Sequence, residues 1–185
     1  MRPNPLPYRW TLTALVLTAL LCSGCPRVLY LDYQPSTSIK GSGAVRVDPF
    51  LYAGHPTGLM KQKELESSAQ NAEALYLSQD IGEFFTGALK RELAVAGYEL
   101  KPDAGRIVSG TIEHFFLDYV GENEQRFQIR ATFQVALKEA PAFSSSCRSD
   151  RQQVRNWMKS GLLIERGVKD CLNEFLYHAQ TAGSL

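Results

Sequence analysis

The chain has 185 residues, of which 44% are hydrophobic and 21% are charged, with 9 prolines and 14 glycines. This length suffices for one ordinary domain and is too short for two typical ones, and the composition excludes disordered, collagenous and coiled-coil chains. The net charge is +1 at pH 7 and like charges form no run, whereas nucleic-acid binding needs a basic patch. The sequence therefore predicts one folded domain with tails and no nucleic-acid partner.

The first 24 residues are typical of a signal peptide and are excluded from the fold. Arg2 and Arg9 make the start basic, and the uncharged apolar stretch that follows, residues 10–21, is shorter than the roughly 20 residues of a membrane-spanning helix. The stretch ends in Leu21-Cys22-Ser23-Gly24-Cys25, which resembles a lipobox. We expect a lipid on Cys25, with acyl chains such as palmitate anchoring the protein to a membrane. The alternatives are an ordinary signal peptide or a short anchor helix.

Two cysteines remain once the signal peptide is assigned. Cys22 leaves with the peptide, Cys25 is acylated, and Cys147 and Cys171 form a pair in an oxidising compartment. A disulfide between them is the simplest prediction. Cys171 also lies on an apolar helical stripe, where a buried free thiol is the alternative.

The first part of the mature chain has little periodicity. Residues 25–43 are rich in Tyr, Pro, Ser, Thr and Gly and are predicted to be a lipidated tether. The alternation in residues 45–48 predicts a strand that is short or at a sheet edge, because Pro49 follows. Residues 53–77 form a long polar loop, which is either a contact for a partner or a solvated insertion.

The strongest periodicity lies in residues 78–97. Apolar residues recur there every three or four positions, with Ser78 as the expected N-cap, Asp80 as favourable charge in the first turn and Gly97 as the stop. Residues 106–120 and 126–137 are rich in β-branched and aromatic residues and flank a turn. They predict an antiparallel hairpin with one face on the core and one in water.

The last third of the chain is less regular. Residues 140–159 contain a serine cluster before Cys147 and suggest a loop or an edge strand, residues 163–175 carry a second helical stripe, and residues 179–185 read as a tail. The expected fold is α+β, an antiparallel sheet with two main helices on one face in the order β-α-β-β-α. We expect residues 44–178 to form this fold as a single periplasmic domain.

No catalytic constellation is recognisable. His55, His114 and His178 are too few and too scattered for a nucleophile triad, and neither they nor the cysteines have zinc-ligand spacing. Glu113 and Asp118 lie at odd separation on one strand, on opposite faces. The sequence therefore predicts no enzyme, no metal and no cofactor.

One strand offers apolar groups on both faces. Phe115, Leu117 and Tyr119 share one face, whereas Phe116 and Val120 share the other. Either a further segment such as residues 59–77 covers one face, or Phe115, Leu117 and Tyr119 are a candidate binding surface for a partner or a lipid.

The lipobox, the valine-rich first strand and the helix that closes in Ala96-Gly97-Tyr98-Glu99-Leu100 before a strand resemble, over about residues 45–177, the YajG-type and transport-auxiliary envelope lipoproteins. The helix, Gly-Tyr and strand run also occurs in the wider group with the amino-terminal fold of the Tol translocation β-propeller protein. This chain departs from the families in its segment 53–77 and its Cys147 and Cys171 pair.

The resemblance implies a non-enzymatic periplasmic domain that assists a transport or envelope-assembly system and contacts another envelope protein. The residue after Cys25 is Pro26 and not Asp, and under the sorting rule of enterobacterial lipoproteins this favours the outer membrane. The alternative function is a periplasmic protein that binds a lipid or another hydrophobic ligand in an apolar groove beside the hairpin. The oligomeric state is not predicted.

Overall fold

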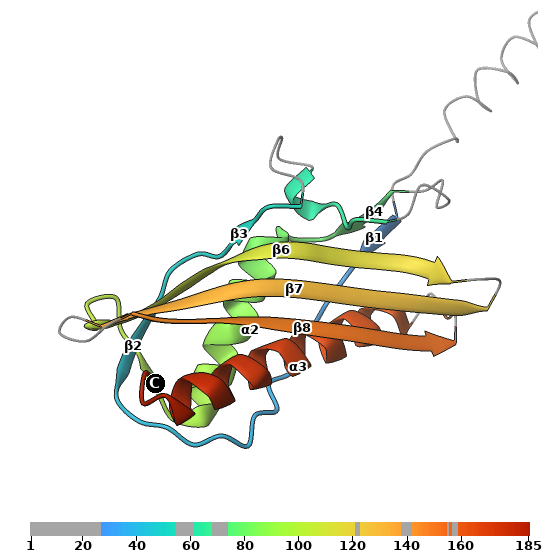
Figure 1. The fold of residues 1–185 in the computed structure, drawn as a ribbon. Helices are drawn as coiled ribbons and strands as arrows, with labels where there is room; N and C mark the ends of the chain where they lie inside the picture. Colours follow the sequence, from blue (N-terminus) through green and yellow to red (C-terminus); the bar gives the residue numbers. More distant parts are fainter. Residues whose placement is uncertain are drawn as a thin grey trace, which may run out of the picture.

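The computed structural model describes residues 27–54, 61–67, 74–120, 123–137, 142–154, 156 and 159–185. Its elements are β1 (Arg27–Leu29), β2 (Ala44–Val47), β3 (Leu51–Tyr52), the 3-10 helix η1 (Lys61–Lys63), β4 (Leu75–Leu77), α2 (Ile81–Ala96), β5 (Glu99–Leu100), β6 (Arg106–Val120), β7 (Glu124–Leu137), β8 (Phe143–Val154) and α3 (Ser160–Thr181). Three long strands form a sheet with both α-helices on one face (Figure 1). The expected α+β class, with helices covering one sheet face, is confirmed.

The main sheet is mixed, whereas the sequence predicted an antiparallel sheet. Its strand order is β5-β2-β6-β7-β8, and β3 also pairs with β6. Strands β6, β7 and β8 are antiparallel, whereas β2 and β3 run parallel to β6 and β2 runs parallel to β5. The reason is the α2 crossover, because a strand, a helix and a returning strand produce parallel neighbours. The expected order β-α-β-β-α also lacks β8 and the short strands.

The first predicted helix is confirmed as α2, with a different N-cap. The N-cap is Asp80 and not Ser78, because the Asp80 carboxylate accepts hydrogen bonds from the backbone amides of Gly82 (2.8 Å) and Glu83 (3.3 Å). Asp80 thus satisfies donors that the first turn leaves open. Gly97 ends the helix at φ 102°, and a Cβ there would lie 2.8 Å from the carbonyl oxygen of Gly41, so both backbone conformation and space require glycine.

The C-terminal third is more regular than its sequence suggests. Residues around Cys147 form the edge strand β8, which pairs with β7 along its length. Helix α3 runs to Thr181, so residues 179–181, which were predicted to begin a tail, belong to the helix. Ala179 and Ser184 are buried, because the helix follows the long strands and its last turn still lies over the sheet.

Aromatic side chains fill the space between sheet and helices. Phe133 of β7 stacks on Phe175 of α3, with ring centroids 4.1 Å apart, and Phe50 lies 5.1 Å from Phe85 of α2 and 5.4 Å from Phe133. All four rings are buried. Since each buried aromatic side chain contributes roughly 1.5–3 kcal/mol, this cluster is a large part of the core energy that joins α2 and α3 to the sheet.

The predicted disulfide is confirmed. Cys147 of β8 and Cys171 of α3 are bonded, with Cα atoms 5.1 Å apart and a sequence separation of 24. Both cysteines are buried, so the bond lies within the core. It joins the edge strand to the helix that covers it.

We expect the double variant Cys147→Ala/Cys171→Ala to lose about 3 kcal/mol of unfolding free energy, because the bond closes a loop of this length in the unfolded chain. Urea unfolding of the oxidised protein and the variant measures the difference. The oxidised protein treated with a reductant is the control and should match the variant. Equal urea midpoints for variant and oxidised protein would contradict the prediction.

The segment predicted to be a long loop is partly structured. Among its described residues, β4 pairs with β1 in a separate parallel sheet, and Glu66 pairs with Phe116 at the edge of β6. Leu65 and the two leucines of β4 are buried. This segment therefore covers part of the domain, as one of the two alternatives for residues 59–77 predicted.

The strap

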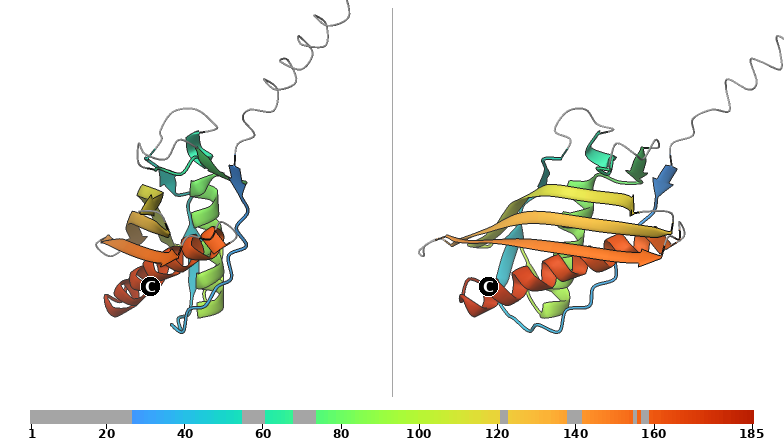
Figure 2. Two further views of the ribbon diagram at one scale, coloured as in Figure 1. Left: turned by 90° about the vertical axis from the view of Figure 1, so that its right-hand side faces the viewer. Right: turned by 45° about the vertical axis from the view of Figure 1, so that its right-hand side comes forward.

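Residues 27–43, here called the strap, are packed on the domain. The sequence predicted a tether there, but Leu29, Tyr33 and Thr37 are buried, and the amide of Gly41 donates to the carbonyl of Ala96 at the end of α2 (2.8 Å). Figures 1 and 2 show the strap running from β1 at one end of the domain to β2 at the other, past α2. The tether prediction was wrong for these residues because side chains from α2 bind them.

A buried carboxylate on α2 holds the centre of the strap. Glu92 is 0% exposed and accepts hydrogen bonds from the Tyr33 hydroxyl (2.5 Å) and from the amides of Ser36 (3.1 Å to both oxygens) and Thr37 (2.8 Å). Burial, and next the hydrogen bond to Glu92, raise the pKa of Tyr33, so its hydroxyl keeps its proton and donates. The carboxylate thereby has three donors from one short stretch of the strap.

We expect Glu92→Gln to release the strap, because the amide group of glutamine would face N–H donors that need an acceptor. The loss should be about 2 kcal/mol of unfolding free energy. Trypsin cleavage after Lys40 should also become faster in the native state. Glu174→Gln, at an exposed position of α3, is the matched control and should change neither quantity. Unchanged cleavage in Glu92→Gln would show that the strap does not depend on this carboxylate.

Candidate binding groove

The structure places the predicted site residues in different surroundings. Cys25, the predicted lipidation site, lies outside the described residues. Phe115 and Leu117 are buried in the core, 0% and 1% exposed, and only Tyr119 of the three is half-buried. The prediction that Phe115, Leu117 and Tyr119 form a binding surface was therefore wrong, because the helices cover this face of the strand. Phe116, whose side chain lies on the opposite face of this strand, is half-buried, and its backbone pairs with Glu66 at the sheet edge.

An open groove lies at another edge of the sheet. It has a volume of about 460 Å³ and lies between β2, β5 and α2. Its accessible apolar part is formed by Leu100, which is 42% exposed, and by Pro102, which is also exposed, whereas Val45 and Val47, which line the groove as well, are buried. The volume falls in the range of ligand-binding clefts. The groove therefore offers an apolar surface that a partner group can reach.

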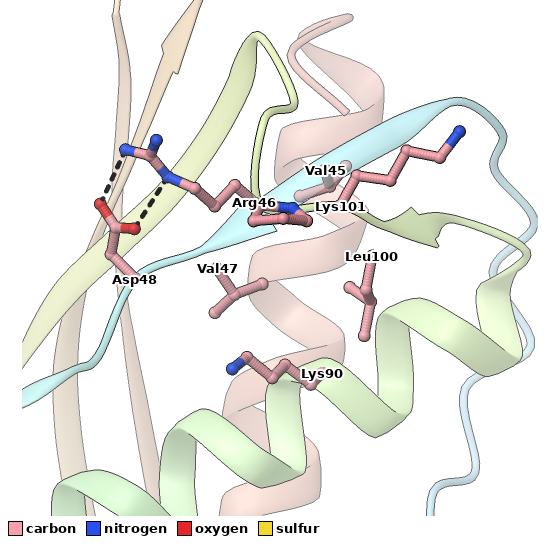
Figure 3. A pocket seen from close by; sticks show the side chains of 8 residues that line it. Val45, Arg46, Val47, Asp48, Lys90, Leu100 and Lys101 are labelled. Atoms are coloured by element: carbon pink, nitrogen blue, oxygen red, sulfur yellow. Dashed lines mark hydrogen bonds and ion pairs between the residues drawn. The ribbon is translucent and has the colours of Figure 1, made fainter.

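Charged side chains surround this apolar surface. Figure 3 shows Val47 and Leu100 extending toward the part of α2 that carries Lys90, whereas Arg46 and Asp48 lie on the other side of β2. Arg46 Nε donates to Asp48 at 2.9 Å, which neutralises that pair. Lys90 is exposed and forms no ion pair with any other described residue. The uncompensated charge beside the groove is therefore positive.

A second lysine on the rim is paired. Lys101 Nζ lies 2.5 Å from a carboxylate oxygen of Glu99. This hydrogen bond raises the pKa of Lys101 and lowers the pKa of Glu99, so both groups stay charged around neutral pH. Both side chains are exposed, and Figure 3 shows Lys101 extending away from the groove.

Strand β5 is the last strand at this edge. The amides of Glu99 and Lys101 donate to Gly43 and Val45 of the β2 side. Because backbone groups alternate in direction along a strand, the N–H and C=O of Leu100 face away from β2. An edge strand of this kind can accept an additional strand from a partner.

A polar cluster at the β6 edge has a structural role. His114 Nδ1 lies 2.7 Å from one oxygen of Glu66, and the other oxygen accepts from the amide of Phe115 (2.9 Å) and the hydroxyl of Tyr52 (3.2 Å). Burial, and next the charge of Glu66, raise the pKa of Tyr52. The His114 ring stacks on Phe116. These bonds fix residue 66 beside β6, at the bulge between Ile112 and His114.

Other kinds of site are not seen in the described part of the chain. Its histidines, cysteines and acids form no group of three or more that could hold a metal ion. Neither α2 nor α3 combines the length and apolarity that crossing a bilayer requires. His178 lies on α3 beside Tyr177, whereas His55 is outside the described residues.

The groove residues were missed from the sequence. Val45 and Val47 were recognised as strand residues, but nothing placed Lys90 or Leu100 beside them. The signal that existed was Lys90 on the exposed side of an amphipathic helix that ends at Gly97 before a strand. A helix that returns to a parallel strand places its exposed flank beside that strand, so the crossover contained the information.

Comparison with known proteins shows the fold. No family model matches the sequence, and no curated protein matches it. The solved structure of protein XCC0632 from Xanthomonas campestris, family DUF330, has a TM-score of 0.65 at 10% identity and covers 85% of this chain and 99% of that one. An uncharacterised protein has a TM-score of 0.61 at 10% identity, with 83% and 99% covered. The chain therefore shares its fold with these two proteins over nearly their whole length.

Proposed function

We propose that this protein is a lipid-anchored, non-enzymatic accessory component of the bacterial cell envelope that binds an envelope protein through the groove. The lipobox-like segment before Cys25 supports the anchor, and an outer-membrane, periplasm-facing location follows from Pro26 under the enterobacterial sorting rule. The family that the sequence resembles, the YajG-type and transport-auxiliary lipoproteins, supports a role in transport or envelope assembly. No catalytic residue is assigned.

The observation that carries the proposal is the position and chemistry of the groove. β2 pairs with β6 at Ile107, near the start of that strand, whereas β6 ends at Val120. At about 3.3 Å per residue, the groove lies about 40 Å from the far end of the strand, where β1 begins the described chain. An anchor on Cys25 would hold one end of the domain while the groove at the other end stays free for a partner.

The groove suits an extended partner segment with an apolar and an acidic residue. The free backbone groups of Leu100 can pair with such a strand, Val47 and Leu100 can contact its apolar side chain, and Lys90 can pair with its carboxylate. Since Arg46 and Lys101 already have carboxylate partners, Lys90 is the group that selects for charge. Reversal of this one charge should therefore affect binding most.

The anchor is tested by the intact mass of protein extracted from bacterial membranes, beside a Cys25→Ala variant. We expect a chain that begins at Cys25 and carries acyl chains, and a variant without them. The variant should leave the membrane fraction, because the acyl methylenes supply about 0.8 kcal/mol each of membrane binding. A mass that still includes residues 1–24, without lipid, would refute the envelope-lipoprotein proposal.

The groove is tested by photo-crosslinking in membranes, with a photoreactive amino acid at Leu100. We expect an adduct with an envelope protein, and at least a tenfold lower yield when Lys90→Glu is added, because an attractive ion pair becomes a repulsive one. Lys63→Glu, on η1 and outside the groove, is the matched control and should leave the yield unchanged. Equal yields in the two variants would exclude Lys90 from the contact.

The second candidate function is binding of a lipid or another hydrophobic ligand. It is favoured by the exposed apolar side chains of Leu100 and Pro102, with Lys90 as the groove cation that is not paired with a carboxylate and can meet an anionic head. The same crosslinking experiment separates the two functions, since mass spectrometry of the Leu100 adduct distinguishes an added lipid from an added peptide.

A further inference from the structure

The strap leaves little free chain between the predicted anchor and the folded domain. Described structure begins at Arg27 in β1, and Leu29 is already buried. Cys25 lies two positions before Arg27, with only Pro26 between them, so the two residues are at most about 7 Å apart. If Cys25 is acylated, the end of the domain that carries β1 therefore lies against the lipid surface and cannot move far from it.

Several elements meet at this end. The carbonyl oxygen of Tyr30 lies 3.6 Å from the position that a Cβ on Gly161 would occupy, which places the start of α3 beside β1. The Ser160 hydroxyl donates to the side chain of Gln125 (2.9 Å), at the start of β7. Glu124, the residue before it, pairs with both Val120 and Val154. Figures 1 and 2 show these termini of β6, β8 and α3 at the same end of the domain as β1.

Exposed apolar side chains gather at this end. Of the nine large hydrophobic residues that are exposed in the described chain, five lie here, and we call them the proximal patch. They are Val28, Tyr30, Val120, Val154 and Leu162. Tyr30 is 81% exposed and Val154 is 75% exposed, so their side chains extend into the surroundings of the domain. Aromatic and aliphatic side chains that protrude in this way partition into the interfacial region of a bilayer.

We propose that the proximal patch inserts into the lipid surface and fixes the orientation of the domain on the membrane. This inference depends on the anchor proposed for Cys25. The short connection to Cys25 selects a bilayer as the occupant of the patch, because an acylated Cys25 would bring this end to the lipid before any other partner. The contact is made in addition to the acyl chains and points the groove away from the membrane.

The charges at this end favour a contact based on apolar groups. Arg27 and Lys159 are exposed there, and so are the acids Asp32 and Glu124. The charges of these four described residues balance, so together they give no strong attraction or repulsion toward anionic headgroups. The insertion should therefore occur on zwitterionic phosphatidylcholine vesicles as well as on vesicles that contain phosphatidylglycerol.

The test uses the acylated full chain in such vesicles, with a nitroxide label on single cysteines introduced at Val154 or Leu162 in the patch, or at Leu100 or Tyr177 in two control variants. The native cysteines do not react, since Cys147 and Cys171 are bonded and buried and Cys25 is acylated. Electron paramagnetic resonance then compares collisions with oxygen, which enters lipid, and with a nickel chelate, which stays in water.

We expect the oxygen-to-nickel ratio at Val154 and Leu162 to be several-fold higher than at Leu100 and Tyr177, on both kinds of vesicle. Equal, water-like ratios at all four positions, with acyl chains present in the intact mass, would overturn the insertion and leave the anchor standing. An intact mass without acyl chains would overturn both proposals. All four positions are exposed, so the labels should not disturb folding.

Discussion

The buried carboxylate of Glu92 is the interaction on which the arrangement of the N-terminal region depends. An ionised carboxylate loses several kcal/mol of solvation when it is buried without partners. Glu92 is compensated because Tyr33, Ser36 and Thr37 donate to it, and none of these donors belongs to its own helix. The strap and Glu92 therefore need each other, and the seventeen residues of the strap become part of the fold.

Much of the domain was predictable from local patterns, and the rest depends on contacts between distant residues. Apolar residues recur about every 3.6 positions in helix α2 and every second position in the β6–β7 hairpin, because each element packs one face on the core. Strand β8 has no such signal, since its inward positions include Ser145, Cys147 and Ser149 in place of large apolar residues. The disulfide was predicted by counting cysteines, without knowledge of the strand that carries one of them.

The strap and the groove could not be predicted for the same physical reason. The sequence pattern of the helix predicts an exposed position for Glu92. Its burial is favourable because the Tyr33 hydroxyl and the amides of Ser36 and Thr37 donate to it. The groove exists because β2, β5 and α2 meet through a parallel crossover, and the sequence had predicted an antiparallel sheet. In both cases the missing information was a partner more than forty residues away, which no local window contains.

The uncovered face of the sheet explains why the two ends of the domain are its candidate contact surfaces. Arg126 pairs with Asp150, and Arg130 pairs with Glu113, across neighbouring strands on that face. Side chains that satisfy one another in water have little to gain from a partner, and surface pairs of this kind contribute little stability. Strands β6, β7 and β8 are hydrogen-bonded along nearly their whole length and joined by a disulfide to α3, so the sheet is a rigid spacer. Because the proximal patch and the groove lie near opposite ends of β6, the proposed membrane contact would set the height of the groove above the lipid through the length of that strand and the tilt that the patch allows.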